Sequence, residues 1–200
     1  SLYENTVSSK NIVIGHSAMR EMSYSNSGNI FNTYNIAIGD SALFSNNPTN
    51  ISNGLKNTAV GHSAMQSNTT GYYNNALGYQ ALYSNTTGFA NVAIGTEVLV
   101  SNTTGYYNVA MGYNVMKENI SGAYNVAAGY QSLTKLSSGG NNVAIGAYCL
   151  NDITTTSNNV ALGSSAGSNL LMSTQNSLYL GYDAEASTPF LAFNYSVAIG

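Results

Sequence analysis

Seven glycines at a fixed spacing of 17 residues constrain the fold of this chain more than any other feature. Each glycine ends a similar pentad, of which Asn91-Val-Ala-Ile-Gly95 is typical. A unit this short cannot bury a core by itself, so the period indicates structural units that stack on their neighbours. The repeat glycines are Gly61, Gly78, Gly95, Gly112, Gly129, Gly146 and Gly163.

The repeat unit suits two short strands joined by two turns. It is too short for a helix-turn-helix repeat, which needs about 33 residues. The pentad supplies one strand, and a second is expected three residues after each glycine, as at Ala64-Met65 and Val98-Leu99. A turn such as Asn68-Thr-Thr-Gly71 follows, in which Asn and Thr bond their own backbone. The sequence therefore predicts an all-β fold, a parallel β-solenoid with 17-residue coils.

The first position of the pentad is asparagine in nine coils. Coils stacked about 4.8 Å apart would place these side chains above one another. Stacked amides can bond along the axis of the stack, and an asparagine can also cap a turn, so both expected roles are structural. The asparagines are Asn11, Asn35, Asn57, Asn74, Asn91, Asn108, Asn125, Asn142 and Asn159.

Each pentad strand presents two faces, because side chains alternate along a strand. Both faces are apolar, which indicates that both are covered. The face with larger side chains is expected to fill the coil, so that replacing Ile94 by Asp would unfold several coils. The other face holds alanine in each coil from Ala37 to Ala161, and it either meets sister subunits around a three-fold axis or packs across a very flat roll. The larger side chains are Val60, Leu77, Ile94, Met111, Ile145 and Leu162.

The spacing of the glycines divides the chain into three zones. Gly15, Gly39 and Gly61 are separated by 24 and 22 residues, and the extra residues fall around Ser23–Tyr34 and Asn46–Lys56. Insertions in a solenoid become loops, often on the binding side. Beyond the regular part the steps lengthen to 18 and 19 residues. The zones are 1–60, irregular coils with insertions; 61–163, the regular roll; and 164–200, looser coils expected to lead to a further region.

The low charge of the chain indicates a surface covered by other protein. Only 6% of residues are charged, against about 25% in a typical soluble domain, so copies of the same chain are expected to cover much of the surface. A net charge of −3 without a basic cluster indicates no nucleic-acid partner. No apolar run reaches the roughly 18 residues of a membrane span. Cys149, the single cysteine, excludes an intrachain disulfide.

The string Asn74–Gly88, NNALGYQALYSNTTG, and the recurring NVAIG resemble the left-handed parallel β-roll heads of YadA-type trimeric autotransporter adhesins. They look equally like the repeat segments of phage tail fibres and of fibre-like proteins from large viruses. The resemblance extends from about Asn11 to Gly200, although adhesin-head coils are usually shorter. It implies an elongated, extracellular homotrimer on a virion, tail fibre or bacterial surface, which attaches to a host glycan or protein receptor.

Three successive N-terminal coils carry His16, Asp40 and His62 one position after the glycine. Stacking would bring these side chains within about 5 Å of one another, and imidazole and carboxylate are ordinary metal ligands. Later coils carry Tyr79 and Thr96 at this position. The preferred interpretation is therefore a solvated polar ladder, and no metal or other cofactor is expected.

Tyrosine is abundant, with 16 residues and no tryptophan. Rows of aromatic rings with polar tips either stack on one another or contact sugars and protein partners. The candidates for ligand or glycan contact are Tyr72, Tyr73, Tyr106, Tyr107 and Tyr124.

Asn-X-Ser/Thr sequons recur in the chain and mark possible N-glycosylation sites. Their spacing fits the turn chemistry of the repeat, which is the preferred explanation, with glycosylation as the alternative. They begin at Asn50, Asn68, Asn85, Asn102, Asn119 and Asn194.

A non-enzymatic fibre segment that mediates host attachment is the predicted function. Asp183 and Glu185 form a close acidic pair, but they lie where the repeat becomes irregular. No nucleophile–base pair and no phosphate-binding loop is apparent. The alternatives are a passive spacer that carries a separate tip domain, an ice-binding solenoid and a polysaccharide-degrading fibre.

Overall fold

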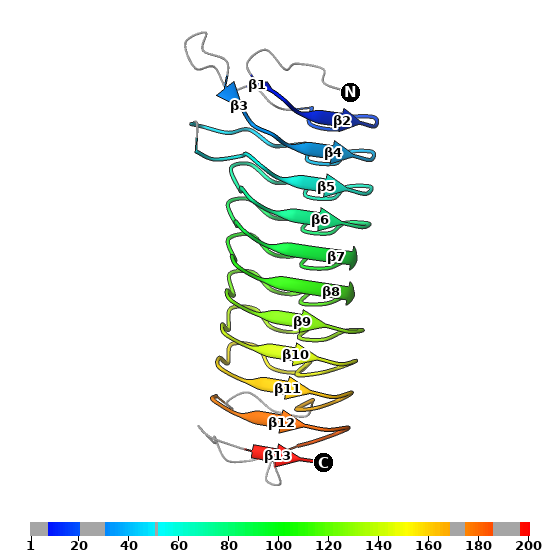
Figure 1. Ribbon diagram of the computed structural model, residues 1–200, viewed down its shortest axis with the longest axis vertical. Coiled ribbons are helices and arrows are strands. Elements are labelled where there is room, and N and C mark those ends of the chain that lie inside the picture. Colours follow the sequence, from blue (N-terminus) through cyan, green and yellow to red (C-terminus); the bar gives the residue numbers. More distant parts are fainter. Residues whose placement is uncertain (1–7, 21–30, 51, 169–174, 186–196) are drawn as a thin grey trace.

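The computed structural model of the chain is an elongated stack of coils (Figure 1). It describes residues 8–20, 31–50, 52–168, 175–185 and 197–200, which contain thirteen strands and no helix. The strands are β1 (Ser8–Ser9), β2 (Ile12–Ile14), β3 (Phe31–Asn32), β4 (Ile36–Ile38), β5 (Thr58–Val60), β6 (Asn75–Leu77), β7 (Val92–Thr96), β8 (Val109–Tyr113), β9 (Val126–Ala128), β10 (Val143–Ile145), β11 (Val160–Leu162), β12 (Leu178–Leu180) and β13 (Val197–Ile199).

Eleven of these strands form one parallel sheet along the length of the stack. β2 and β13 lie at its edges, and each pentad strand pairs with the strand of the next coil. Equivalent positions face each other, since Ala93 pairs with both Ala76 and Ala110. β1 and β3 form a separate parallel pair. The prediction of an all-β parallel solenoid is thus confirmed.

The second strand predicted for each coil is absent, and that prediction was wrong. The third and fourth residues after each glycine are both buried, as for Ala81 with Leu82 and Val98 with Leu99. A strand could bury only one residue of each pair, because its side chains alternate. The chain instead places Leu82 and Leu99 in the left-handed region, with φ of 54° and 53°. Neighbouring coils still bond here, since the Leu82 N–H donates to the Val98 carbonyl over 2.9 Å.

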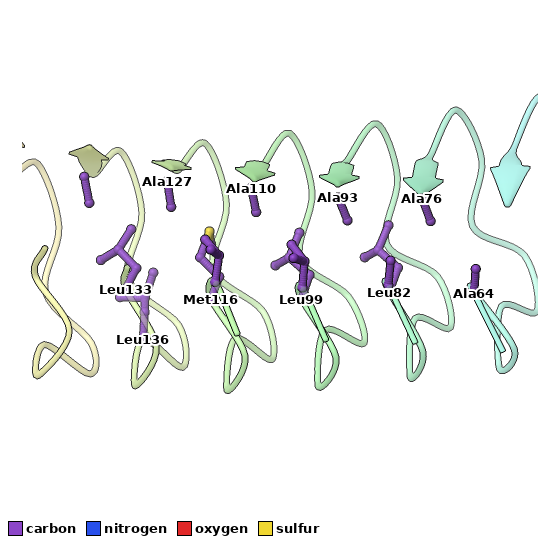
Figure 2. Close-up of a cluster of buried hydrophobic side chains, with 14 of the residues drawn as sticks. Ala64, Ala76, Leu82, Ala93, Leu99, Ala110, Met116, Ala127, Leu133 and Leu136 are labelled. Atoms are coloured by element: carbon purple, nitrogen blue, oxygen red, sulfur yellow. The ribbon is translucent and has the colours of Figure 1, made fainter. Parts of the chain in front are cut away.

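The apolar part of the interior of each coil is one thin layer of side chains (Figure 2). The strand contributes its alanine, and the opposite wall contributes a leucine or methionine, as where Ala93 lies opposite Leu99 and Ala110 lies opposite Met116. All four of these side chains are completely buried. A small residue on the strand lets the two walls approach closely, so the roll is flat.

The larger strand side chains lie outside the coil, so the predicted inner and outer faces were reversed. Ile94 is 39% exposed and Leu77 is 51% exposed, whereas Ala76 and Ala93 are buried. The flat interior is already filled by the alanines and by residues of the opposite wall such as Leu99. Of the two alternatives for the alanine face, packing across a flat roll is correct, and contact with sister subunits through that face is wrong.

The pentad asparagines bond one another along the stack. Oδ1 of Asn74 accepts hydrogen bonds from the backbone N–H of Asn91 over 3.0 Å and from its Nδ2 over 3.1 Å. Nδ2 of Asn91 also donates to the Gly105 carbonyl over 2.8 Å. The same arrangement continues to Asn159, and the side chains from Asn35 onward are completely buried. Each amide therefore caps the backbone of the next coil and extends the ladder at once.

A second asparagine ladder lies in the turns, where the sequence predicted only hydrogen bonds from Asn and Thr to their own backbone. Nδ2 of Asn85 donates to Oδ1 of Asn68 over 2.7 Å and to the Gly88 carbonyl over 3.0 Å. The ladder ends where Leu136 takes the next position, and Oδ1 of Asn119 is consequently buried without a hydrogen-bond partner. From Asn68 to Asn119 the turn asparagines recur every 17 residues, and this spacing could have predicted the second ladder from the sequence. The members are Asn46, Asn68, Asn85, Asn102 and Asn119.

The repeat glycines are required by the close approach of successive coils. Gly78 has a φ of +133°, which L side chains rarely adopt. A Cβ at this position would collide with the carbonyl oxygen of Gly95 in the next coil. The glycine column thus sets how tightly the coils stack.

The three sequence zones share one continuous sheet. β5 of the first zone pairs with β6 of the regular roll, and β11 of the roll pairs with β12 of the last zone. In the second insertion, the Thr49 and Asn50 N–H groups donate to Oδ1 of Asn53 over 2.9 and 3.3 Å, which closes a small loop. Most of the first insertion, residues 21–30, lies outside the described residues.

Candidate interaction surfaces

The outer face of the large sheet is an exposed apolar strip. It consists of the second and fourth positions of each pentad, and only Thr58 and Asn75 interrupt its apolar side chains. The most exposed members form two columns along the stack. Those more than a third exposed are Ile12, Ile14, Leu77, Ile94, Met111, Val126, Ile145, Leu162, Val197 and Ile199.

The outer strip is as large as the apolar patches that commonly mark interaction sites. With strands about 4.8 Å apart and about 3.3 Å per residue, the second to fourth pentad positions of the eleven strands cover a flat area of about 48 by 10 Å, or about 480 Å². The largest apolar patch of a typical monomer covers about 300–600 Å², and patches of this size commonly mark interaction sites. The strip carries no charged side chain. It is therefore the strongest candidate for a contact surface in the described part of the chain.

Tyrosines lie at both ends of the strands that form the outer strip. Tyr73, Tyr107 and Tyr124 precede their pentads and are 47%, 49% and 51% exposed. Another row, which includes Tyr113 and Tyr130, follows the glycines and is similarly exposed. Amphipathic rings at the border of an apolar area are typical of interaction surfaces.

The predicted tyrosine contacts divide into two kinds. The rings of Tyr72, Phe89 and Tyr106 stack on one another at centroid distances of 5.0 and 4.9 Å, with planes within 3°. Their faces are therefore largely occupied by each other. Tyr107 and Tyr124 stack at 5.2 Å and expose about half of their surface, so these two offer more area to a ligand.

No protein-family model, curated protein or solved structure matches this chain. The assignment of function therefore depends on the geometry of its surfaces. No helix among the described residues has the length and apolarity needed to cross a bilayer.

His16, Asp40 and His62 come together as the coil register predicts. Nδ1 of His16 lies 3.0 Å from Oδ1 of Asp40, and Nε2 of His62 lies 3.5 Å from Oδ2. The imidazole nitrogens thus face the carboxylate itself, and His62 also stacks on Tyr79 at 5.6 Å. Within the described ranges, no group of three or more His, Cys, Asp or Glu side chains is arranged to hold a metal ion. The arrangement is an exposed polar ladder.

Charged groups on the roll bind one another. Nζ of Lys117 donates to the Glu97 carboxylate over 2.6 Å, and Nζ of Lys135 donates to the Asp152 carboxylate over 2.6 Å. The hydrogen bond and the charge of Asp152 raise the pKa of Lys135. These pairs neutralise part of an already small charge.

The single thiol is not a reactive group. Cys149 lies inside the coil, where its Sγ contacts the Ala161 carbonyl oxygen at 3.3 Å. Burial raises the pKa of the thiol to about 12, so the nucleophilic thiolate is not formed at neutral pH. In the acidic pair named above, Glu185 accepts a hydrogen bond from the Ser168 hydroxyl over 3.4 Å.

Proposed function

We propose that the chain is a non-enzymatic segment of an extracellular, homotrimeric surface fibre that attaches to a host glycan or protein receptor. The observation that carries this proposal is the outer strip, a straight apolar surface on a solenoid of very low charge. Three left-handed rolls that lie parallel around a three-fold axis would bury their strips against one another. The strip is only three residues wide, which suits a narrow triangular contact.

The energetics of the outer strip support association. Full burial of a Val, Leu or Ile side chain contributes about 1.5–3 kcal/mol, so burial of a half-exposed one contributes about 1 kcal/mol. Ten strip residues are more than a third exposed, and together they contribute about 10 kcal/mol per protomer. Association costs about 4–15 kcal/mol. A trimer buries three such strips, which contributes about 30 kcal/mol, and its two association steps cost about 8–30 kcal/mol, so burial of the strips favours assembly.

Charge substitutions in the outer strip test the assembly. In the double variant Ile94→Asp/Met111→Asp, two carboxylates on neighbouring coils would have to be desolvated in the trimer, so we expect monomers with the parent's circular dichroism. The matched control, Thr87→Asp/Thr104→Asp, places the same charges on exposed turn positions of neighbouring coils and should remain trimeric. Light scattering after size-exclusion chromatography measures the mass of the assembly for both variants and for the parent. A trimeric strip variant, or a parent that is not trimeric, would contradict the proposal.

The exposed tyrosines support the attachment role, and the uniform coils of residues 61–163 favour the second candidate, a passive spacer. Binding of the trimeric parent to a glycan array and to host cells separates the two. We expect binding that is reduced in Tyr107→Ser/Tyr124→Ser, because these rings are half exposed and lie next to each other. If a well-folded trimer binds neither glycans nor host cells, the attachment role is wrong and the passive spacer is the favoured function.

A further inference from the structure

Four sequons of this chain lie inside the fold. A sequon ordinarily marks a surface loop of a secreted protein. Here the asparagines of four of them are completely buried rungs of the second asparagine ladder, whereas Asn50 is exposed. The sixth sequon, at Asn194, lies outside the described residues. The buried four are Asn68, Asn85, Asn102 and Asn119.

From this burial, we infer that the chain folds in a compartment without Asn-linked oligosaccharide transfer, and that glycosylation of the second ladder is incompatible with the solenoid. The inference concerns where the chain folds, and it is independent of the trimer and of the receptor. Display on a virion or cell surface would then follow folding elsewhere.

The hydrogen bonds of the ladder use both protons of each amide. Nδ2 of Asn85 donates to Oδ1 of Asn68 over 2.7 Å and to the Gly88 carbonyl over 3.0 Å. Asn102 repeats this arrangement with Asn85 and Gly105, over 2.8 and 3.2 Å. Glycosylation joins Nδ2 to the anomeric carbon of a pyrophosphate-linked oligosaccharide, with loss of one Nδ2 proton and release of the pyrophosphate carrier. A glycosylated rung therefore lacks one of the two donors that the fold uses.

The space around the ladder excludes a sugar. Even one added carbon at Gly71 would lie 2.6 Å from Nδ2 of Asn85, and one at Gly88 would lie 2.9 Å from Nδ2 of Asn102. Such distances are shorter than van der Waals contact, so a pyranose ring on Nδ2 cannot be accommodated. A transferase cannot reach these buried amides in the folded chain either. Only the unfolded chain can be modified, and the modified chain cannot close its coils.

The third position of each sequon offers a matched variant. Thr70, Thr87, Thr104 and Ser121 lie in the turns, and the last three are exposed. The inter-coil hydrogen bonds are made by the middle threonines, as where Oγ1 of Thr86 donates to the Thr103 carbonyl over 3.0 Å. Changing the four third positions to Ala removes the sequons and keeps every ladder asparagine.

The test directs the full chain into the secretory pathway of a eukaryotic cell, with and without these four alanine substitutions. We expect the parent to be glycosylated on ladder asparagines, retained and protease-sensitive. The variant should be secreted as a protease-resistant solenoid that carries sugar at Asn50, which serves as an internal control for transferase access. Both proteins should fold in the bacterial cytosol, and a variant that does not fold there is replaced by Val substitutions at the same positions.

Three results would overturn the inference. One is a secreted, folded parent with occupied ladder asparagines, as shown by mass spectrometry of its peptides. Another is a secreted, folded parent in which these asparagines are unmodified while Asn50 is occupied, because folding would then outpace transfer. The third is a variant that folds in bacteria and fails in the secretory pathway with no sugar on the ladder.

Discussion

Replacing Asn91 by Asp changes one buried rung of the pentad ladder without changing its shape. The new carboxylate can still accept from the Asn108 N–H and Nδ2, which now bond Oδ1 of Asn91 over 3.0 and 3.1 Å. It cannot donate to Oδ1 of Asn74 or to the Gly105 carbonyl, which Nδ2 reaches over 3.1 and 2.8 Å. One substitution therefore removes two donors and leaves a buried oxygen facing two acceptors.

The expected loss of stability depends on pH. When the new Asp is protonated, its O–H replaces one of the two donors, so one hydrogen bond is lost, at a cost of about 0.5–1.5 kcal/mol. Burial raises the pKa of a carboxyl by up to about 3–5 units, so holding the new Asp neutral at pH 7 costs a further 4 kcal/mol or so. The folded pKa then exceeds the unfolded value, so the unfolded state binds fewer protons above pH 4 or so, and stability falls with rising pH by about 1.4 kcal/mol per unit. Asn91→Asp should thus cost about 5 kcal/mol at pH 7 and far less at pH 4.5.

Hydrogen exchange resolves this loss coil by coil, which suits a repeat protein whose coils need not unfold together. The N–H of residue 91, which donates to Oδ1 of Asn74 over 3.0 Å, should lose protection first at pH 7, followed by the N–H groups of the adjacent coils, and should regain it at pH 4.5. Asn141→Asp is the control, because Asn141 is exposed just before a pentad. If Asn91→Asp and Asn141→Asp showed equal protection at pH 7, the reasoning about the ladder would be refuted.

Three further predictions test the interior. Gly78→Ala should cost at least about 2–3 kcal/mol in chemical denaturation, because its φ of +133° strains any side chain; a neutral effect would contradict the glycine column. The free energy of unfolding of the parent should fall between pH 9 and 12, because only the thiol of the unfolded chain ionises there. In Cys149→Ala this fall should be shallower by up to about 1.4 kcal/mol per pH unit. Identical slopes for the two proteins would contradict a buried, un-ionised thiol in the folded chain. Leu136→Asn should be about 2 kcal/mol less destabilising than Leu133→Asn, because it gives Oδ1 of Asn119 a donor; equal melting temperatures would show that the ladder cannot be extended.

The period alone was enough to predict the stack. Glycines in 17-residue phase require coils that repeat their backbone, and the pentad Asn91–Gly95 combines a ladder residue, a short strand and a close-approach glycine. The position of the strand in each coil followed from the same pattern. The pairing of Ala76, Ala93 and Ala110 is its direct result.

Which strand face is buried could not be read from the sequence, because both faces are apolar and alternate with the same period. The opposite wall of the coil determines which face is buried, because Leu82 and its equivalents have left-handed backbone conformations there and fill the coil. Such positions usually carry glycine, since other residues are strained there by about 1–3 kcal/mol. In this chain they carry residues as different as Lys56, Tyr73 and Ala90, so composition gave no sign of them.

Sedimentation equilibrium of the whole chain over a range of concentrations tests most directly whether the outer strip joins copies of the protein. The proposal predicts a species with three times the 21.0 kDa mass of one chain. Such a trimer should dissociate when Ile94 and Met111 carry carboxylates. A parent that sediments as a single chain at every concentration, with its apolar strip open to water, would contradict the account.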